Sequence, residues 1–283
     1  MRARGVAGSV GRLGVSDHGC WIYGSDREYA EFRQAALRFA ADGMALGQRL
    51  LFVGDRSEDE VLADLAPFGD VDTLRRRGAL DIQCRADVYV GDGLVADPDA
   101  QLAAYDLAVE DAIAAGYAGV RVVAEVTGLA TDPSSCDEQV RWEMVGDRYM
   151  ATSRPLAALC GYDRRVIGDA AAAVLTCVHP VHHDESVPFA LFADEGALCL
   201  TGEVDAFEAP LLTRALAAVP PDGSLVLDVS DLRFIDVAGT AVLARHAVDQ
   251  AAHGLDVSLR GARPLLRTMW DMLGFCDESV RFT

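Results

Sequence analysis

The sequence predicts an α/β protein of two domains, and three observations support this prediction. A length of 283 residues suffices for two domains of ordinary size. Over residues 18–178, short apolar runs alternate with longer segments of helical spacing, the pattern of a parallel sheet with helices on both faces. Residues 179–188 are polar and proline-bracketed, and a second, shorter series of strands and helices follows them.

The elements of the first domain are expected to follow one another as strand, helix, strand. We expect strands at residues 20–23, 49–53, 80–82, 120–124, 157–160 and 174–178. We expect helices in the intervals between them, at residues 29–44, 61–65, 102–113, 140–150 and 163–173. This alternation favours crossover connections between parallel strands.

The second domain is predicted to be a compact α/β module. Strands are expected at residues 189–192, 197–201, 225–229 and 257–259, and helices at residues 207–218, after Asp236, and at residues 265–273. The predicted divisions of the chain are a disordered lead-in at 1–15, the first domain at 16–180, a linker at 181–187 and the second domain at 188–283.

The composition excludes several classes of function. The net charge is −19, and none of the 25 basic residues is Lys. Because binding to a nucleic-acid backbone needs clustered cations, we expect no nucleic-acid partner. Schiff-base and P-loop chemistry both require a Lys, so we expect neither.

The lengths of the apolar runs and the spacing of the cysteines indicate where in the cell the protein resides. No run approaches the roughly 18 apolar residues that a membrane span needs, and the first residues lack the apolar core of a signal peptide. The seven Cys are scattered, unlike the dense spacing of a small disulfide scaffold. We therefore expect a protein of the reducing cytoplasm that does not associate with membranes.

Two segments of the second domain carry a family resemblance. Residues 200–205 (LTGEVD) and 225–239 (LVLDVSDLRFIDVAG) resemble the STAS family of anti-sigma-factor antagonists, and the resemblance extends over residues 187–283. It implies a small α/β domain that binds an anti-sigma factor or a serine-kinase-like protein. The implied partner-binding residues are Asp205, Asp236, Val237, Ala238, Gly239 and Thr240. We also expect Asp236 to cap the following helix, and Gly239 to let another surface approach the backbone closely.

The family's phosphorylation switch is expected to be absent. The resemblance implies a Ser immediately before the glycine, phosphorylated by an ATP-dependent anti-sigma kinase, whereas this chain has Ala238 before Gly239. A methyl group cannot accept phosphate. Thr240, one residue beyond the glycine, carries a hydroxyl group, and whether it is phosphorylated stays open here.

The first domain resembles another family. Residues 17–23 (DHGCWIY), 47–53 (GQRLLFV), 159–163 (LCGYD) and 177–180 (CVHP) resemble the MEDS, or DcmR-like, sensory domain over residues 16–180. This resemblance implies a RecA/KaiC-like core without a working nucleotide site, and sensing of small molecules, hydrocarbon-like compounds among them. The chain has neither the GxxxxGK motif nor any Lys, so we expect no ATP hydrolysis.

Histidines, cysteines, carboxylates and aromatic residues of the first domain form a candidate ligand site. Several lie near predicted strand ends, and ligands commonly bind at the carboxyl edge of a parallel sheet. The candidate ligand-binding residues are His18, Cys20, Trp21, Tyr23, Glu125, Trp142, Glu143, Cys160, Tyr162, Cys177 and His179. Three interpretations remain open: a pocket for an unidentified small molecule, a metal site and plain core packing. The tight Cys-x-x-Cys pairs of structural zinc are missing, so the sequence leads us to expect no metal, and it identifies no cofactor.

Together these observations predict a signalling regulator that is not an enzyme and has no catalytic residues. A sensory domain would control a STAS domain that acts on transcription through its partner. One alternative is a small-molecule or thiol-dependent enzyme using Cys20, His18 or Glu143. Another is a structural scaffold in a STAS assembly, and self-association is left open.

Overall fold

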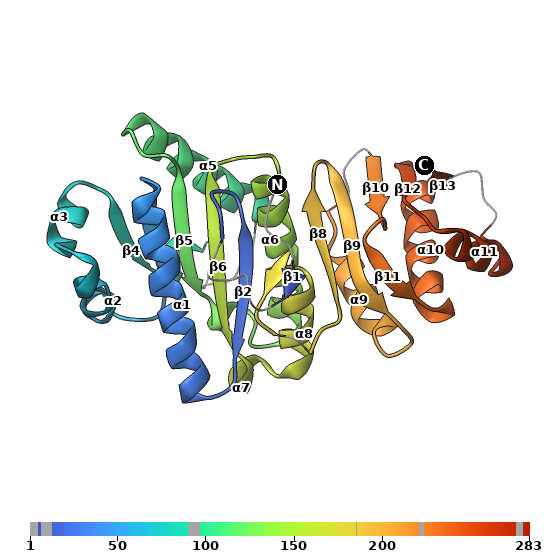
Figure 1. The fold of residues 1–283 in the computed structure, drawn as a ribbon, viewed down its shortest axis with the longest axis horizontal. Helices are drawn as coiled ribbons and strands as arrows, with labels where there is room; N and C mark the ends of the chain where they lie inside the picture. Colours follow the sequence, from blue (N-terminus) through green and yellow to red (C-terminus); the bar gives the residue numbers. More distant parts are fainter. Residues whose placement is uncertain (1–4, 7–12, 90–96, 185, 221–223, 276–279) are drawn as a thin grey trace.

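The two predicted domains are both present, side by side along the long axis of the molecule (Figure 1). The computed structural model describes residues 5–6, 13–89, 97–184, 186–220, 224–275 and 280–283. Each domain is an α/β unit, as the sequence predicted. Within the described ranges, no helix combines the length and apolarity needed to cross a membrane.

The first domain is built on a seven-stranded sheet in the order β1-β7-β2-β6-β5-β3-β4. Every pairing within it is parallel, which confirms the predicted parallel sheet. The strands are β1 (Gly5–Val6), β2 (His18–Tyr23), β3 (Arg49–Gly54), β4 (Leu80–Cys84), β5 (Val120–Glu125), β6 (Leu156–Asp163) and β7 (Val181–His182).

Helices cover both faces of this sheet because its central strands carry buried apolar residues on both faces. On β2, Trp21 packs in a cluster with Phe32 of α1, whereas Cys20 packs in a different cluster with Val140 of α6 and Leu175 of α8. The helices are α1 (Asp26–Ala45), α2 (Glu58–Leu65), α3 (Val71–Arg76), α4 (Arg85–Val88), α5 (Pro98–Ala114), α6 (Pro133–Ala151), α7 (Arg164–Ile167) and α8 (Asp169–Cys177), with short 3₁₀ turns η2 (Ala66–Phe68) and η3 (Thr127–Leu129).

The second domain contains a mixed sheet in the order β11-β9-β10-β12-β13, with β8 antiparallel to β9. Its strands are β8 (Phe189–Asp194), β9 (Ala197–Val204), β10 (Ser224–Asp228), β11 (Leu232–Ile235), β12 (Asp256–Arg260) and β13 (Val280–Phe282). Its helices are α9 (Ala209–Ala217), α10 (Val237–Ala252) and α11 (Pro264–Met272).

The strand predicted at residues 174–178 is wrong, because residues 169–177 form helix α8. This helix begins after Gly168 and is rich in Ala, with six of its nine residues buried. A helix buried on most sides shows no amphipathic period, and a short apolar run of this kind cannot be told from a buried strand by periodicity. Cys177 is therefore the last residue of a helix.

The predicted disordered lead-in and linker are both partly ordered. Gly5–Val6 pairs with Val181–His182, and β7 in turn pairs with β2, so this part of the predicted linker extends the first sheet. Leu13 is 3% exposed, at the end of the predicted lead-in. The remaining residues of that segment up to residue 12, except Gly5–Val6, lie outside the described ranges.

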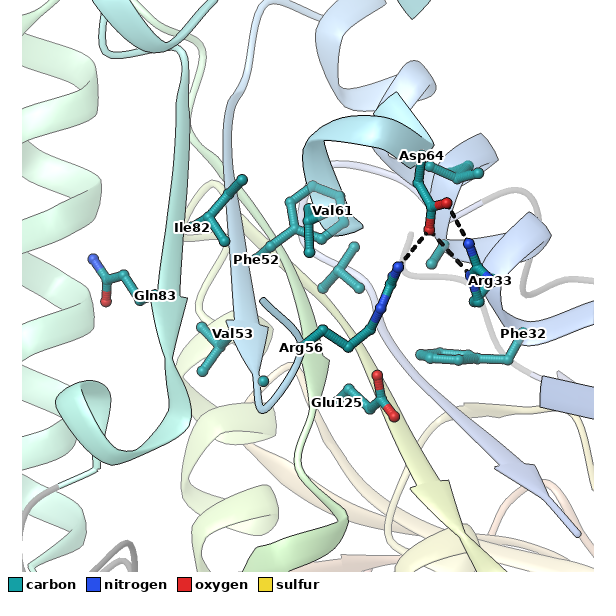
Figure 2. A pocket seen from close by; sticks show the side chains of 14 residues that line it. Phe32, Arg33, Phe52, Val53, Arg56, Val61, Asp64, Ile82, Gln83 and Glu125 are labelled. Carbon is teal, nitrogen blue, oxygen red and sulfur yellow. Dashed lines mark hydrogen bonds and ion pairs between the residues drawn. The ribbon is translucent and has the colours of Figure 1, made fainter. Parts of the chain in front are cut away.

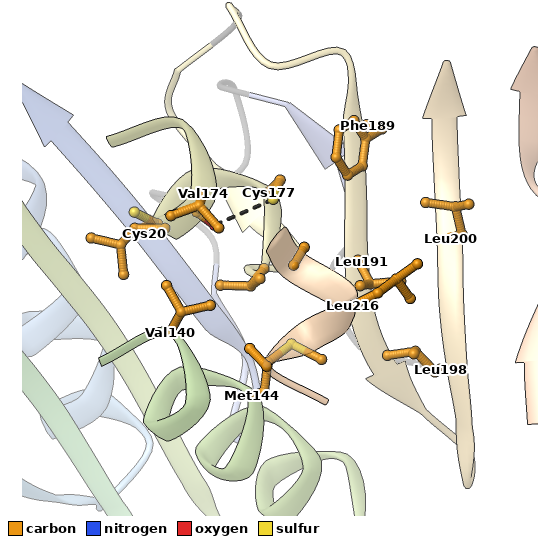
Figure 3. Packing of buried hydrophobic residues seen from close by; sticks show 14 of the residues in the cluster. Cys20, Val140, Met144, Val174, Cys177, Phe189, Leu191, Leu198, Leu200 and Leu216 are labelled. Atoms are coloured by element: carbon orange, nitrogen blue, oxygen red, sulfur yellow. Dashed lines mark hydrogen bonds between the residues drawn. The ribbon is translucent and has the colours of Figure 1, made fainter. Parts of the chain in front are cut away.

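The two domains share one continuous apolar core. Val140 and Met144 of α6 belong to the same buried cluster as Leu191 of β8 and Leu216 of α9 (Figure 3). Helix α6 therefore lies between the sheet of the first domain and strand β8 of the second. At the rim of this contact, Arg214 of α9 forms an ion pair with Asp137 of α6, at 2.8 Å.

A buried arginine joins the centre of the first sheet to the segment before β2. Arg121 of β5 is 1% exposed and donates hydrogen bonds to Gln48 Oε1 and to the carbonyl oxygens of Phe39, Leu13 and Gly14, at 2.8–3.2 Å. Burial lowers the pKa of Arg121 to about 10, so the guanidinium stays charged at neutral pH.

Replacing this guanidinium should destabilise the first domain. Arg121→Met removes the donors for four buried acceptors, and we expect the free energy of unfolding to fall by about 3 kcal/mol. Chemical denaturation monitored by circular dichroism measures the change. Arg27→Met is the control, because Arg27 is 85% exposed and should change stability by less than about 0.5 kcal/mol. Equal losses in the two variants would contradict the structural role of Arg121.

Candidate functional site

Four side chains from separate segments of the first domain meet in one buried group. His18 begins β2, Cys160 lies within β6, Glu143 lies on α6 and His179 follows α8. One donor atom of each residue lies within 4.8 Å of the other three, and none of the four residues is more than 5% exposed. We call these four residues the donor cluster.

The local structure explains why these side chains converge. On the parallel pair of β2 and β6, His18 lies opposite Ala158, so His18 and Cys160, two residues further along β6, point to the same face. Helix α6 crosses this face and presents Gln139, Glu143 and Asp147, which are spaced four residues apart and share one side of the helix.

The donor atoms lie close together. Glu143 Oε2 is 3.1 Å from His18 Nε2, 3.4 Å from His179 Nε2 and 3.6 Å from Cys160 Sγ. Cys160 Sγ is 3.7 Å from His18 Nε2. The two imidazole rings are tilted against each other with their centroids 4.1 Å apart. The Glu143 carboxylate is therefore the centre of the cluster.

A second layer of polar groups holds these side chains in place. Tyr162 donates a hydrogen bond to Glu143 Oε1, and Gln139 Nε2 donates to the same oxygen at 2.7 Å. His179 Nδ1 lies 2.6 Å from the carbonyl oxygen of Leu175, which turns its Nε2 toward the cluster. His18 Nδ1 lies 3.3 Å from Asp147 Oδ1. These contacts fix the ring orientations before any ligand binds.

Burial and charge act in opposite directions on the titrating groups. Burial alone would raise the pKa of Glu143, but the neighbouring His179 and His18 hold this pKa well below its ordinary value. Burial lowers the pKa of His18, yet hydrogen bonds to Asp147 and Glu143 outweigh that effect and raise it. Burial and the charge of His18 lower the pKa of His179. One imidazole is therefore favoured as a cation and the other as neutral.

An apolar pocket adjoins the cluster. Its lining includes His18, Glu143 and Cys160 from the cluster, together with Tyr105 and Trp142, whose rings stack with centroids 5.7 Å apart. The cavity volume is about 40 Å³, room for a few water molecules, so a larger ligand requires the lining side chains to move. The arrangement places polar donors at one side of an apolar space.

The structure brings together six of the predicted ligand-binding residues. His18, Glu143, Cys160 and His179 form the cluster, Tyr162 bonds to it, and Trp142 lines the adjoining pocket. The expected position at the carboxyl edge of the sheet is wrong, because His18 lies at the amino end of β2 and the cluster lies on a face of the sheet, beneath α6.

The other predicted ligand residues lie elsewhere. Cys20 and Cys177 are fully buried in the apolar core on the same side of the sheet. Trp21 and Tyr23 point to the opposite face, against α1. His183, within the predicted linker, stacks on Trp21 with ring centroids 3.8 Å apart, and its neighbour His182 is 3% exposed. Side-chain alternation on β2 separates Trp21 and Tyr23 from His18 and Cys20.

Glu125 lies in a second pocket, on the α1 face, and its carboxylate is already engaged. Tyr23 donates a hydrogen bond to Glu125 at 2.8 Å, and Tyr29 donates one at 3.3 Å. Figure 2 shows Asp64 of this pocket paired with both Arg33 and Arg56. The charges of Asp64, Arg33 and Arg56 therefore offset one another, and tyrosine hydroxyls bond to Glu125.

Gln139 and Asp147 were missed in the sequence. The available signal was the four-residue spacing of Gln139, Glu143 and Asp147, which places three polar side chains on one side of a helix. Asp147 is completely buried. Its other carboxylate oxygen, Oδ2, accepts a hydrogen bond from the backbone amide of Ala193 in β8, at 2.7 Å, so one carboxylate contacts both domains.

The predicted partner surface is divided between exposed and buried groups. Asp236 caps α10 by accepting the Gly239 amide at 2.9 Å, as expected. Gly239 is buried, and a side chain there would meet Val204 and Ile235 of its own domain. Thr240 is fully buried, and its hydroxyl donates to the Asp236 carbonyl oxygen, so it is not presented to a kinase.

Several apolar side chains near the start of α10 are exposed. Val237 is 55% exposed, and Phe207, in the loop where Asp205 accepts the Phe207 amide, is 89% exposed. These two loops follow the paired ends of β11 and β9, where Ile235 lies opposite Val204. Phe234 and Leu265, also exposed, line an adjoining groove.

Comparison with known families assigns both domains. Residues 17–180 match the model described as MEDS, the MEthanogen/methylotroph, DcmR Sensory domain. Residues 190–280 match the model described as Mlab, STAS domain. Both resemblances seen in the sequence are confirmed, in the expected order. None of the curated proteins matches the chain.

The buried thiols should react slowly in the native protein. Burial and the charge of Glu143 raise the pKa of Cys160 well above its ordinary value, whereas Cys84 is exposed. We therefore expect iodoacetamide to label Cys84 at least about tenfold faster than Cys160, with the difference lost in denaturant. Peptide mass spectrometry over a labelling time course measures the rates. Rapid native labelling of Cys160 would show that the cluster opens to solvent.

Proposed function

This chain belongs to the MEDS family, and from that premise we propose that its sensory domain controls how the STAS domain is presented to a protein partner. A sensory domain joined to a STAS domain indicates a signalling or regulatory role. The proposed partner is an anti-sigma factor or a related serine-kinase-like protein. Sequestration of this partner would change transcription in the cytoplasm without DNA contact.

The observation that carries this proposal is the shared carboxylate of Asp147. One of its oxygens lies 3.3 Å from His18 in the donor cluster, and the other accepts the amide of Ala193 in β8. A ligand that moves His18 or Glu143 therefore acts on a group that anchors the STAS domain. Such coupling requires the ligand to favour one arrangement of β8 over another.

The sensed ligand is proposed to be a small molecule that enters the pocket beside the cluster. Tyr105 and Trp142 offer apolar contacts, while His18 and Glu143 offer polar ones. A pocket of this composition favours a mostly apolar molecule with one or two polar atoms. Its chemical identity is left to ligand screening.

The proposed partner surface lies around the start of α10. Exposed Val237, Phe207 and Phe234 supply apolar contacts, and Asp205 and Asp236 add negative charge. Exposed apolar side chains on neighbouring loops are common at protein-interaction sites. Because Ala238 cannot be phosphorylated, we propose that ligand binding replaces phosphorylation as the switch.

We further propose that the chain has no enzymatic activity. The thiol considered as a nucleophile, Cys20, is fully buried, and burial raises its pKa well above the ordinary value. A protonated, enclosed thiol is a poor nucleophile. In the second pocket, Tyr23 and Tyr29 donate hydrogen bonds to the Glu125 carboxylate, so this carboxylate is already engaged.

A charge placed on the partner surface should abolish binding. Val237→Arg is expected to weaken binding to a purified serine-kinase-type anti-sigma protein by about tenfold or more, because the guanidinium would be desolvated at the interface. Isothermal titration calorimetry measures the affinity. Val166→Arg is the matched control, because Val166, in the first domain, is 54% exposed. The proposed surface is wrong if both variants bind like the wild type while the wild type binds tightly.

Loss of the Asp147 carboxylate should loosen β8. Asp147→Ala leaves the buried amide of Ala193 without this acceptor, and we expect its hydrogen exchange to accelerate and the free energy of unfolding to fall by about 1–3 kcal/mol. Nuclear magnetic resonance of the labelled chain measures the exchange.

The matched control removes a different contact between the domains. Asp137→Ala breaks the ion pair with Arg214, in which Asp137 is 51% exposed, and should cost less than about 1 kcal/mol. Unchanged exchange at Ala193 in Asp147→Ala would argue against this carboxylate as the link between the domains.

A further inference from the structure

We propose that the donor cluster binds a single divalent transition-metal ion of the zinc class, with His18 Nε2, His179 Nε2, Glu143 Oε2 and Cys160 Sγ as its four ligands. This inference names a ligand for the cluster. It rests on the proposed function only where it expects metal binding to change the partner affinity of the STAS domain. Metal binding itself is a property of the free chain.

Four of the six separations between the donor atoms match the edges of a tetrahedral site, and the other two are within 4.8 Å. With zinc bonds of about 2.0–2.1 Å to nitrogen, about 2.1 Å to oxygen and about 2.3 Å to sulfur, tetrahedral edges are about 3.4 Å between nitrogen and oxygen and about 3.6 Å to sulfur. Glu143 Oε2 lies 3.1 and 3.4 Å from the two imidazole nitrogens. Cys160 Sγ lies 3.6 Å from Glu143 Oε2 and 3.7 Å from His18 Nε2.

The donor types suit the same class of metal. Two imidazoles, one carboxylate and one thiolate form a mixed set that zinc, cobalt and iron accept, whereas calcium and magnesium prefer oxygen ligands alone. A dication would also offset the charges of Glu143 and the ionised thiolate in a site no more than 5% exposed.

The outer contacts are those expected around metal ligands. His18 presents Nε2 to the cluster while its Nδ1 faces Asp147, and His179 presents Nε2 while its Nδ1 faces the Leu175 carbonyl oxygen. Glu143 presents Oε2 while Tyr162 and Gln139 bond to Oε1. A carboxylate or carbonyl behind each ligating imidazole is the common arrangement at protein metal sites.

His179 supplies an independent indication. Its Nε2 is buried without a well-oriented hydrogen-bond partner, 3.4 Å from Glu143 Oε2. A buried polar atom normally has a partner, and a metal ion shared with Glu143 would provide one. Ordinary core packing would leave this nitrogen without one.

The test uses the full-length protein, stripped with a chelator and titrated with Co²⁺. We expect one Co²⁺ per chain, with the strong visible bands of a tetrahedral ion and a near-ultraviolet thiolate charge-transfer band. Zn²⁺ should then displace Co²⁺ and bleach both. Failure of the wild-type chain to bind Co²⁺, or binding without the thiolate band, overturns the proposal.

Substitutions assign the ligands. Cys160→Ser should remove the charge-transfer band, whereas Cys20→Ser should retain it, because Cys20 lies directly opposite Cys160 in the β2–β6 register but outside the cluster. Asp147→Asn should weaken Co²⁺ binding by about 10–100-fold, because it acts through His18. Loss of the band in Cys20→Ser but not in Cys160→Ser overturns the assignment.

A measurement on the wild type covers the case in which Cys160→Ser does not fold. X-ray absorption at the zinc edge should give one sulfur at about 2.3 Å and three nitrogen or oxygen ligands at about 2.0–2.1 Å. Two or more sulfurs, or none, overturns the proposed set. Metal binding with no effect on partner affinity would uphold the site and count against the proposed control of the STAS domain.

Discussion

The buried polar side of helix α6 is the constraint on which the rest of this structure depends. Glu143 and Asp147 both lie in the interior, where an ionised carboxylate is tolerated only with compensating partners. His18, from β2, contacts both of these carboxylates. One electrostatic arrangement therefore fixes the position of α6 on the sheet and the orientation of His18. It also places Cys160 in the donor cluster.

The same helix determines how the two domains meet. Its apolar side chains Val140 and Met144 pack in a cluster that includes Leu191 of the STAS domain, and Asp147 accepts the Ala193 amide. The STAS domain is thus attached through a packed core and a buried hydrogen bond, in addition to the connecting segment. Rearrangement inside the sensory domain has a direct mechanical route to β8, since packed interiors transmit small displacements.

The loop at the start of α10 in the STAS domain has a tightly supported backbone. Asp236 caps α10 and Gly239 packs tightly against Val204, so the local structure of the partner loop is retained. Ala238 and the buried hydroxyl of Thr240 leave this loop without an accessible phosphate acceptor. Under the proposed function, ligand binding in the first domain takes the place of phosphorylation at this loop.

The sequence by itself determined the fold class, the order of the two domains and most of the chemically capable residues. Strand and helix periods, the lack of Lys and the two family motifs are local properties, which a single chain displays directly. It did not distinguish helix α8 from a strand, because a helix buried on most sides has no polar stripe. Only the tertiary structure decided which candidates meet. Side-chain alternation on β2 sends His18 and Trp21 to opposite faces of the sheet. Asp147 contacts His18, 129 positions before it in the chain, and Ala193, 46 positions after it. Local periodicity in the sequence cannot reveal contacts over such separations.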